Sequence, residues 1–339
     1  MTPRFLALTL SFAAMSGTLI AATPAATHLT YRASIYSIRD DGTQRVLIAQ
    51  PEPAVPDLVR SPGGHSILFT RQVDGVWVLF AADRSGANAV RLTPPELPVG
   101  EYPTGAFSPD GRLIAFRRPI ECGYRCFHAK LYVVGRDGGG LRLIAENAAS
   151  FSWAPDSRRL AYGDPRGRGR LSRTIYVMDV ESTETTPVAQ GSLHAPVWAP
   201  RGERIAYSAN VRGFGVACFV NADGSRRRCT RGRSLTSLVW SRDGRRVAFR
   251  QASPRQLGYV DSDARRVRSL GNHGRDARPA AWSPDGKRLL VWSGGGRASV
   301  LRLAAPRRSM QVIGEDGWIS DIRWRRRSIT YVASQPVGP

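Results

Sequence analysis

One short phrase recurs seven times along this chain, and its spacing limits what the chain can fold into. Each copy runs from an aromatic or apolar residue, in most cases through a Pro- or Gly-containing turn, into a short alternating apolar run. The lead residues lie 48, 46, 45, 42, 42 and 42 positions apart and are Val59, Phe107, Trp153, Trp198, Trp240, Trp282 and Trp324. A period of 40 to 50 residues in a chain of strands indicates β-sheet units repeated around an axis.

Most repeats contain two hairpins. The turn Ser108-Pro109-Asp110-Gly111 leads into the alternating run 113–116, and Asp137-Gly138 then joins the apolar runs 131–134 and 141–144. Pro, Asp and Gly each favour a tight turn, and Asp-Gly between alternating strands favours a hairpin. Two hairpins supply four strands, the content of one propeller blade. We therefore predict an all-β, seven-bladed β-propeller with four-stranded antiparallel blades, and six blades as the alternative count.

The two ends of the chain complement each other. The last repeat offers one hairpin, 322–324 and 329–332, while the N-terminal region offers another, 34–38 and 46–48. Combining them completes one blade, closes the ring and removes two open sheet edges. Residues 29–32 leave an alternative open, because they resemble a further strand that could displace part of the C-terminal hairpin.

These repeats resemble the TolB-like, WD-repeat-like family of β-propellers. The resemblance rests on the Ser/Ala-Pro-Asp-Gly turns at 108–111, 154–156 and 283–286, on the strands after them and on the Asp-Gly hairpins. It extends over about residues 28–333 and implies a single propeller domain, which we place at residues 28–335, without the separate N-terminal α/β domain of TolB. The resemblance implies a scaffold and leaves the activity open.

The first 26 residues have the layout of a secretory signal peptide. Arg4 precedes an apolar stretch over 5–20, and the small pairs Ala21-Ala22 and Ala25-Ala26 offer cleavage positions. We predict a periplasmic or secreted protein with no transmembrane segment after cleavage. An uncleaved N-terminal anchor is the alternative, because the apolar stretch nearly reaches membrane-spanning length.

The four cysteines fall into two local pairs. If Asp223-Gly224 forms a two-residue turn, Cys218 faces Cys229 across an antiparallel hairpin, within disulfide reach. Cys122 and Cys126 would close a small ring in a loop of the second blade. Two local disulfides fit an oxidising compartment. The alternative is a metal site made of Cys122, Cys126 and His128, although this spacing matches no strong zinc pattern.

The chain is strongly basic, with a formal net charge of +22 from 49 basic and 27 acidic residues. Loss of the first 26 residues removes only Arg4, and all other basic residues except Lys130 and Lys287 are arginines. Such a field attracts polyanions, but a coding bias toward arginine is the favoured explanation of the composition. Nucleic acid is not expected as a partner, because export would separate the protein from nucleic acid. In addition, the aromatic residues lie in strands rather than among the basic runs.

Catalytic motifs and cofactor motifs are missing from the sequence. It contains no Gly-x-Ser-x-Gly, no His-Glu-x-x-His and no phosphate-binding glycine loop before a helix. The histidines are spread over the repeats as His28, His65, His128, His194 and His273. The repeated tryptophans occupy one structural position, which indicates packing between blades. We expect no cofactor and no bound metal. The sequence favours a binding protein over an enzyme.

The segments that lead into the innermost strands should surround one mouth of the central channel, the default binding site of this architecture. There they contribute Tyr102, His194, Arg278 and Trp318. The leading hypothesis is a monomeric, non-catalytic binding protein that engages a protein or an anionic cell-envelope component at this mouth. The alternative is a channel-centred hydrolase or lyase acting on an anionic polysaccharide. Nonspecific adhesion to anionic envelope polymers is a third possibility.

Overall fold

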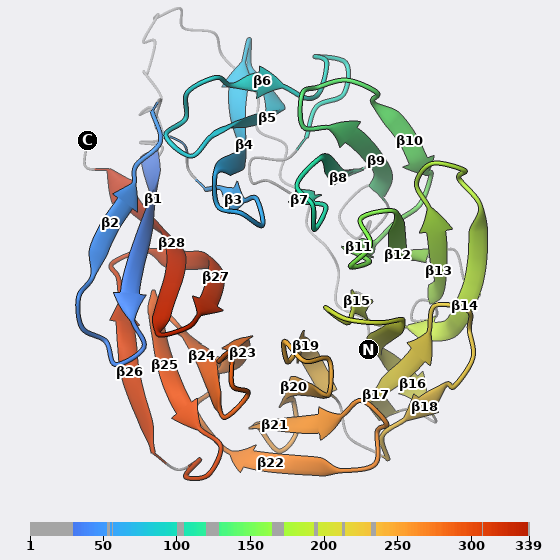
Figure 1. The fold of residues 1–339 in the computed structure, drawn as a ribbon, viewed down its shortest axis with the longest axis vertical. Coiled ribbons are helices and arrows are strands. Elements are labelled where there is room, and N and C mark those ends of the chain that lie inside the picture. Colours follow the sequence, from blue (N-terminus) through green and yellow to red (C-terminus); the bar gives the residue numbers. More distant parts are fainter. Residues whose placement is uncertain are drawn as a thin grey trace, which may run out of the picture.

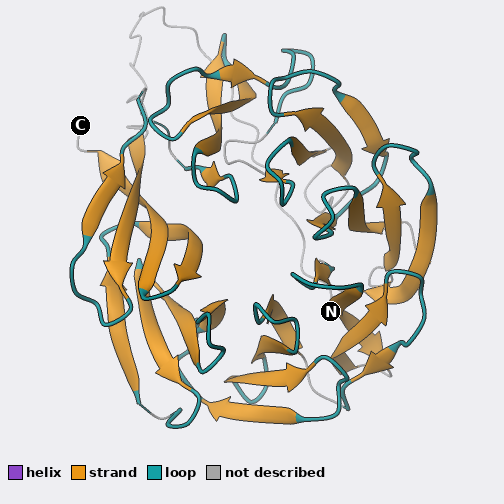
Figure 2. Cartoon of the chain, in the orientation of Figure 1, coloured by secondary structure: helices purple, strands orange, loops and turns teal. Residues whose placement is uncertain are grey.

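Seven β-sheet blades surround one axis in the computed structural model of the chain (Figure 1). The structure describes residues 30–52, 55, 57–99, 105–119, 129–164, 173–192, 196–211, 214–231, 235–306 and 308–337. Within these ranges the backbone forms only strands, turns and loops (Figure 2), and none of it forms a helix that could cross a lipid bilayer. The all-β, seven-bladed propeller predicted from the repeat spacing is therefore confirmed.

Each blade has four antiparallel strands, counted here from the innermost strand outward. Blades 1 to 3 consist of β3 (Val59–Arg60), β4 (Ser66–Val73), β5 (Val76–Asp83), β6 (Val90–Arg91), β7 (Gly105–Phe107), β8 (Leu113–Pro119), β9 (Ala129–Gly135), β10 (Arg142–Ala145), β11 (Ser150–Trp153), β12 (Arg159–Asp164), β13 (Arg173–Asp179) and β14 (Thr185–Ser192). Blades 4 to 6 consist of β15 (Val197–Trp198), β16 (Arg204–Val211), β17 (Phe214–Asn221), β18 (Arg228–Cys229), β19 (Leu235–Trp240), β20 (Arg246–Gln251), β21 (Gln256–Asp261), β22 (Val267–Gly271), β23 (Arg278–Trp282), β24 (Arg288–Gly294), β25 (Arg297–Arg302) and β26 (Ser309–Gly314). Blade 7 consists of β27 (Trp318–Arg325), β28 (Ser328–Val337), β1 (Thr30–Arg39) and β2 (Val46–Ala49).

Blade 7 joins the two ends of the chain. Its strand order is β2-β1-β28-β27, and β1 pairs with β28 from Thr30 opposite Val337 to Arg39 opposite Ser328. The prediction that N-terminal strands complete the last blade is therefore confirmed. The described part of the segment that resembled a further strand, 30–32, belongs to β1, so it extends this ladder rather than displacing the C-terminal hairpin. Residues 1–29, with the predicted signal peptide, lie outside the described residues.

Buried apolar side chains fill each of the seven junctions between neighbouring blades. One such cluster packs Leu68 and Leu79 of blade 1 against Phe107 and Phe116 of blade 2. The cluster that closes the ring packs Ile35 of blade 7 against residues of blade 1. Five further clusters repeat this arrangement around the ring. Stability is thus distributed over interfaces between neighbours, as expected for a repeat array.

The repeated tryptophans end innermost strands and connect adjacent blades. The indole Nε1 of Trp153 donates to the carbonyl of Ala106 at 3.1 Å, and Trp240 donates to Val197 at 2.8 Å. Trp282 donates to the Val239 carbonyl at 2.9 Å. Each acceptor lies on the innermost strand of the preceding blade. The tryptophan position therefore serves packing between blades, as the repeat predicted, and three of the tryptophans add a hydrogen bond to the preceding blade. Trp198 Nε1 instead donates to the Gly202 carbonyl of its own blade at 3.1 Å.

The hairpin of β17 and β18 carries a disulfide. Cys218 pairs directly with Cys229 in the strand register, and their sulfur atoms are bonded, with the Cα atoms 4.0 Å apart. This confirms the pairing predicted from the Asp223-Gly224 turn. The second predicted pair, Cys122 and Cys126, lies outside the described residues, as does the alternative metal ligand His128.

A carboxylate organises the turn between the first and second strands in several blades. In blade 2, Ser108 Oγ donates to Asp110 Oδ1 at 2.6 Å, and the same oxygen accepts the Arg112 backbone N–H at 3.0 Å. Blade 6 repeats the first of these contacts between Ser283 and Asp285 at 2.6 Å. Glycine then follows with a positive φ, as at Gly111, a conformation that other residues rarely adopt. The local sequence thus supplies most of the hydrogen bonds of the turn, and in blade 2 the Asp110 backbone N–H also donates to Ser157 Oγ of blade 3 at 2.9 Å.

Candidate binding rim and an arginine-lined cavity

The first residues of the innermost strands lie at one end of the ring, and this set is called the rim here. All innermost strands run in the same direction, because each blade repeats the same antiparallel order. Two of the four predicted site residues are described: Arg278 is the first residue of β23 and Trp318 is the first residue of β27. The other two, Tyr102 and His194, lie outside the described residues.

Arg278 is exposed and held by its cross-strand neighbour. It pairs with Trp292 in the register of β23 and β24, and its guanidinium carbon lies 5.5 Å from the centre of the Trp292 ring. A guanidinium over an aromatic face is attracted by the ring quadrupole. The contact limits the freedom of this long side chain while leaving it accessible, so Arg278 can meet a partner with less loss of side-chain entropy.

Trp318 begins the innermost strand of the next blade. It pairs with Ser334 across β27 and β28 and is partly exposed. Because β23 and β27 are neighbouring innermost strands in contact, Arg278 and Trp318 both lie at the starts of adjacent innermost strands, with Trp318 two residues further from the repeated tryptophan of its strand. A tryptophan and an arginine on one concave rim are residue types that often dominate binding energy.

An acidic residue, Asp57, stands just before β3, the innermost strand that follows β27 around the ring. Its Oδ1 accepts hydrogen bonds from Ser320 Oγ and from the Leu58 backbone N–H, both at 2.8 Å. Burial raises the pKa of the Asp57 carboxyl; these two hydrogen bonds oppose the rise, and the nearby Asp321 carboxylate adds to it. The sequence analysis missed Asp57. Its only sequence signal is an acidic residue directly before an innermost strand.

Further arginines lie at the same end of blades 5 and 6. The second strand of a blade ends where the first begins, so Arg250 near the end of β20 shares this face with Arg278. Arg250 Nη2 donates to the Arg275 carbonyl at 3.0 Å, in the segment that leads to β23. Arg255, Arg275 and Arg297 are also exposed here. The rim beside Arg278 is therefore rich in positive charge.

A buried ionic network joins blade 7 to blade 1. Arg60 Nε donates to Asp321 Oδ2 at 2.7 Å, and Arg323 Nε donates to Asp321 Oδ1 at 3.0 Å. The same two guanidinium groups donate to backbone carbonyls across the junction, among them Thr330 for Arg60 and Ser61 for Arg323. Arg60 is only 5% exposed, so its charge depends on this carboxylate and these carbonyls for compensation.

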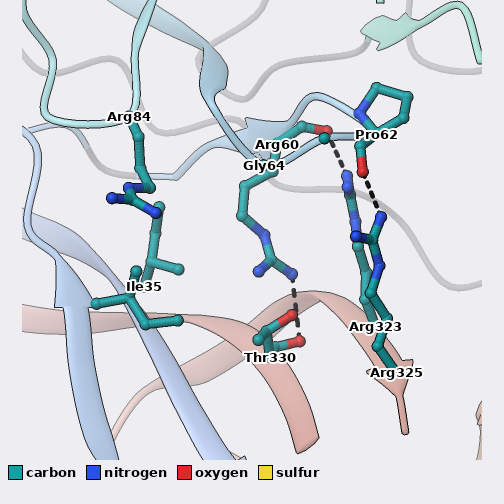
Figure 3. A pocket seen from close by; sticks show the side chains of 10 residues that line it. Ile35, Arg60, Pro62, Gly64, Arg84, Arg323, Arg325 and Thr330 are labelled. Carbon is teal, nitrogen blue, oxygen red and sulfur yellow. Dashed lines mark hydrogen bonds between the residues drawn. The ribbon is translucent and has the colours of Figure 1, made fainter. Parts of the chain in front are cut away.

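Beside this network lies a cavity of about 150 Å³, shown in Figure 3. Four of the residues that line it are arginines, namely Arg60, Arg84, Arg323 and Arg325. The Gly63-Gly64 turn of blade 1 forms another part of the lining. The cavity opens at the end of the ring opposite to the rim, because this turn joins the end of β3 to the start of β4.

The structure shows no cluster of metal-ligating side chains among the residues that it describes. Within those ranges, no three His, Cys, Asp or Glu side chains gather closely enough to hold a metal ion. The predicted histidine at the rim, His194, is not among these residues, and neither is the cysteine pair of blade 2.

Comparison with known proteins gives likenesses of fold. No family model matches the chain, and no curated protein sequence is similar to it. Among solved structures, a protein assigned as TolB from Agrobacterium tumefaciens is 20% identical, with a TM-score of 0.52, over 91% of this chain and 100% of that one. TolB from Acinetobacter baumannii is 16% identical, with a TM-score of 0.50, over 90% of this chain and 67% of that one.

Oligogalacturonate lyases share the architecture as well. The lyase from Vibrio parahaemolyticus is 14% identical, with a TM-score of 0.61, over 90% of this chain and 98% of that one. An oligogalacturonate lyase in complex with manganese is 15% identical with a TM-score of 0.59, over 89% of this chain and 91% of that one. At these identities the likenesses concern the scaffold, which hosts different functions. The chain is thus a seven-bladed β-propeller with a TolB-like fold.

Proposed function

We propose that this chain is an exported, non-catalytic binding protein that engages a protein or an anionic cell-envelope component at its rim. The observation that carries the proposal is the placement of Arg278 over Trp292, next to the blade that presents Trp318. Arginine and tryptophan at a concave centre are typical anchors of protein interfaces. The remaining rim residues would then exclude water around these anchors.

The charge of the rim favours a partner with acidic groups. Arg250, Arg255, Arg275 and Arg297 surround Arg278 at this end of blades 5 and 6, and the whole chain carries a formal net charge of +22. Such a field raises the rate of encounter with anionic partners and weakens as salt is added. Asp57, which accepts a hydrogen bond from Ser320 two residues after Trp318, is an acidic group near this end of blade 7.

Export is part of the proposal. The apolar stretch after Arg4 has the layout of a signal peptide, and the disulfide between Cys218 and Cys229 suits an oxidising compartment. We infer a periplasmic or secreted location for the propeller. Processing can be checked by sequencing the N-terminus of the mature protein, which should begin near residue 27.

The test begins with a partner captured from a cell-envelope extract by the mature protein and identified by mass spectrometry. The purified partner is then titrated against the wild type and against the Arg278→Ala/Trp318→Ala double variant. We expect the double variant to raise Kd at least tenfold, about 1.4 kcal/mol, because hot-spot residues usually contribute this much or more.

Arg242→Ala is the matched control, because it removes one exposed arginine from the turn between β19 and β20, at the end of the ring opposite to the rim. Its Kd should stay close to that of the wild type at physiological salt. If the double variant binds as tightly as the wild type, the rim is not the site. Equal weakening by Arg242→Ala, with steep loss of binding as salt rises, would indicate nonspecific adhesion instead.

The alternative function, a hydrolase or lyase that acts on an anionic polysaccharide, rests on the basic charge of the chain. It requires catalytic groups near the axis, and for metal-dependent chemistry a bound ion. Metal analysis of the purified protein separates the two functions: stoichiometric manganese or zinc, together with degradation of polygalacturonate, would overturn the binding proposal.

A further inference from the structure

Blade 1 lacks the carboxylate that other blades place in the turn after their innermost strand. At the equivalent position, blades 2, 3, 5 and 6 carry Asp110, Asp156, Asp243 and Asp285, whereas blade 4 carries Arg201 and blade 1 carries Gly63. The rest of the turn is preserved. Ser61 Oγ accepts the Ser66 backbone N–H at 3.0 Å, as Ser108 Oγ accepts that of Leu113 at the same distance in blade 2. Glycine at this position thus leaves blade 1 without the negative charge, while the backbone of the turn keeps the same arrangement.

The missing carboxylate would lie where positive charge is concentrated. The cavity between blades 7 and 1 is lined by Arg60, Arg84, Arg323 and Arg325, and the same turn contributes Gly63 and Gly64 to its wall (Figure 3). Asp321, which bridges Arg60 and Arg323, is the only carboxylate paired with any of these four arginines among the described residues. The four guanidinium groups therefore retain an excess of positive charge.

Two of the four arginines have donor groups to spare. Arg325 donates through Nη2 to the Pro62 carbonyl, and no carboxylate of the described residues lies within ion-pair distance of it. Arg84 is exposed, and its guanidinium has no hydrogen bond or ion pair to the described residues; its backbone N–H bonds to the His65 carbonyl. One guanidinium comes from blade 7 and the other from blade 1, and both residues line the same cavity.

Neighbouring cavities on the same end of the ring include carboxylates in their lining. The cavity of about 660 Å³ between blades 1 and 2 is lined by Arg112 and Arg136 but also by Asp110 and Asp137. The cavity of about 370 Å³ between blades 6 and 7 is lined by four arginines together with two carboxylates, and these residues are Asp40, Asp41, Arg288, Arg302, Arg308 and Arg327. The lining of the cavity between blades 7 and 1 contains no acidic residue.

We propose that the cavity between blades 7 and 1 binds a phosphate group, either inorganic phosphate or a phosphate monoester. Phosphate carries a charge of about −1.5 to −2 near pH 7 and offers three or more acceptor oxygens. Arginine matches such oxygens with two parallel donors. A volume of about 150 Å³ is far above the roughly 10–15 Å³ that one water requires, so a phosphate group fits.

Binding here would stabilise the closed ring. The ligand would supply the negative charge that Asp110 and its equivalents supply in other blades, and it would connect Arg84 of blade 1 to Arg325 of blade 7. A ligand that binds the folded state alone raises stability in proportion to the logarithm of its concentration over Kd. The site is separate from the rim, so this inference stands or falls independently of the proposed function.

Gly63→Asp is the sharpest test, because it restores the turn sequence of blade 2 and adds a carboxylate at a residue that lines the cavity. Gly63 has no positive φ, and an added Cβ would meet only the exposed side chain of His65, at 3.0 Å, so the variant should fold. Calorimetric titration with inorganic phosphate, at constant ionic strength set with sodium chloride, should show saturable binding to the wild type. We expect at least a tenfold rise in Kd for Gly63→Asp.

Arg84→Gln/Arg325→Gln should weaken phosphate binding in the same way, whereas Arg242→Gln should leave it unchanged. Arg242 is the matched control, because it is an exposed arginine in the equivalent turn of blade 5. Glycerol 1-phosphate, titrated in parallel, distinguishes a monoester from inorganic phosphate by which of them binds more tightly. Absence of saturable binding of both ligands to the wild type, or equal binding by Gly63→Asp, overturns the proposal.

Discussion

Arginine side chains join neighbouring blades at recurring positions. Arg159, Arg246 and Arg288 begin second strands, and each lies over the tryptophan of the next blade, with 4.9 to 5.3 Å from guanidinium carbon to ring centre. Arg288 also forms an ion pair of 2.8 Å with the buried Asp40 carboxylate of blade 7. Part of the arginine excess therefore has a structural basis, beyond the coding bias or polyanion binding that the composition alone allows.

Trp282 offers a test of the contacts between blades. Its indole donates to the Val239 carbonyl, packs edge-on to Tyr259 with ring centres 5.9 Å apart, and lies under Arg246. Trp282→Phe should lower the free energy of unfolding by about 0.5–1.5 kcal/mol, mainly through loss of the hydrogen bond. Trp282→Ala should lower it by about 3–5 kcal/mol, because a large buried side chain is removed.

Urea denaturation measures both changes, and the exposed Val267→Ala in the same part of the ring serves as the control. If Trp282→Ala were no more destabilising than Val267→Ala, the tryptophan would not be part of the interface between blades 5 and 6.

At the scale of elements, each turn after an innermost strand is specified locally. The hydrogen bond from Ser283 lowers the pKa of Asp285 below its usual value, and the Lys287 backbone N–H lowers it further. Because the folded-state pKa is depressed, the ionised carboxylate stabilises the fold above the unfolded pKa of about 3.9. This contribution is lost as the pH falls through the folded-state value.

Asp285→Ala should therefore destabilise the protein most near neutral pH, by about 0.5–1.5 kcal/mol. The difference in unfolding free energy from the wild type should shrink as the pH is lowered below about 4. Denaturation curves recorded between neutral and acidic pH measure this trend. Asp276→Ala removes an exposed carboxylate without such hydrogen bonds and controls for net charge. A difference for Asp285→Ala that is independent of pH contradicts the assignment.

Elements with a strong local signal were predictable from the sequence, and contacts between distant segments were not. The Cys218–Cys229 pairing followed from one turn, since strand register is set by the hairpin. By contrast, Arg60 and Asp321 lie 261 residues apart in sequence, and no pattern in either segment indicates that they meet. The sequence places Arg278 and Trp318 at the starts of their strands, but the contact of Arg278 with Trp292 depends on side-chain packing.

At the scale of the whole molecule, the ring depends on a single non-local strand pair. β1 and β28 come from opposite ends of the chain and pair over ten residues. Among the described residues, they are the only two neighbouring strands of a blade that are not consecutive in the sequence. The junction of this blade with blade 1 contains the ionic network of Arg60, Asp321 and Arg323. Closure thus brings Asp57 of blade 1 to β27, which begins with the rim residue Trp318, at one end, and forms the arginine-lined cavity at the other.

The most direct test of this account compares the thermal unfolding of the mature protein with that of a variant lacking residues 28–50. The deletion removes β1 and β2, including Ala33, Ile35 and Ile38, which are at most 5% exposed, and it opens two sheet edges. Burial of each large apolar side chain contributes about 1.5–3 kcal/mol, so the midpoint should fall by roughly 10 °C or more. An unchanged midpoint would contradict the closure of the ring by its N-terminal strands.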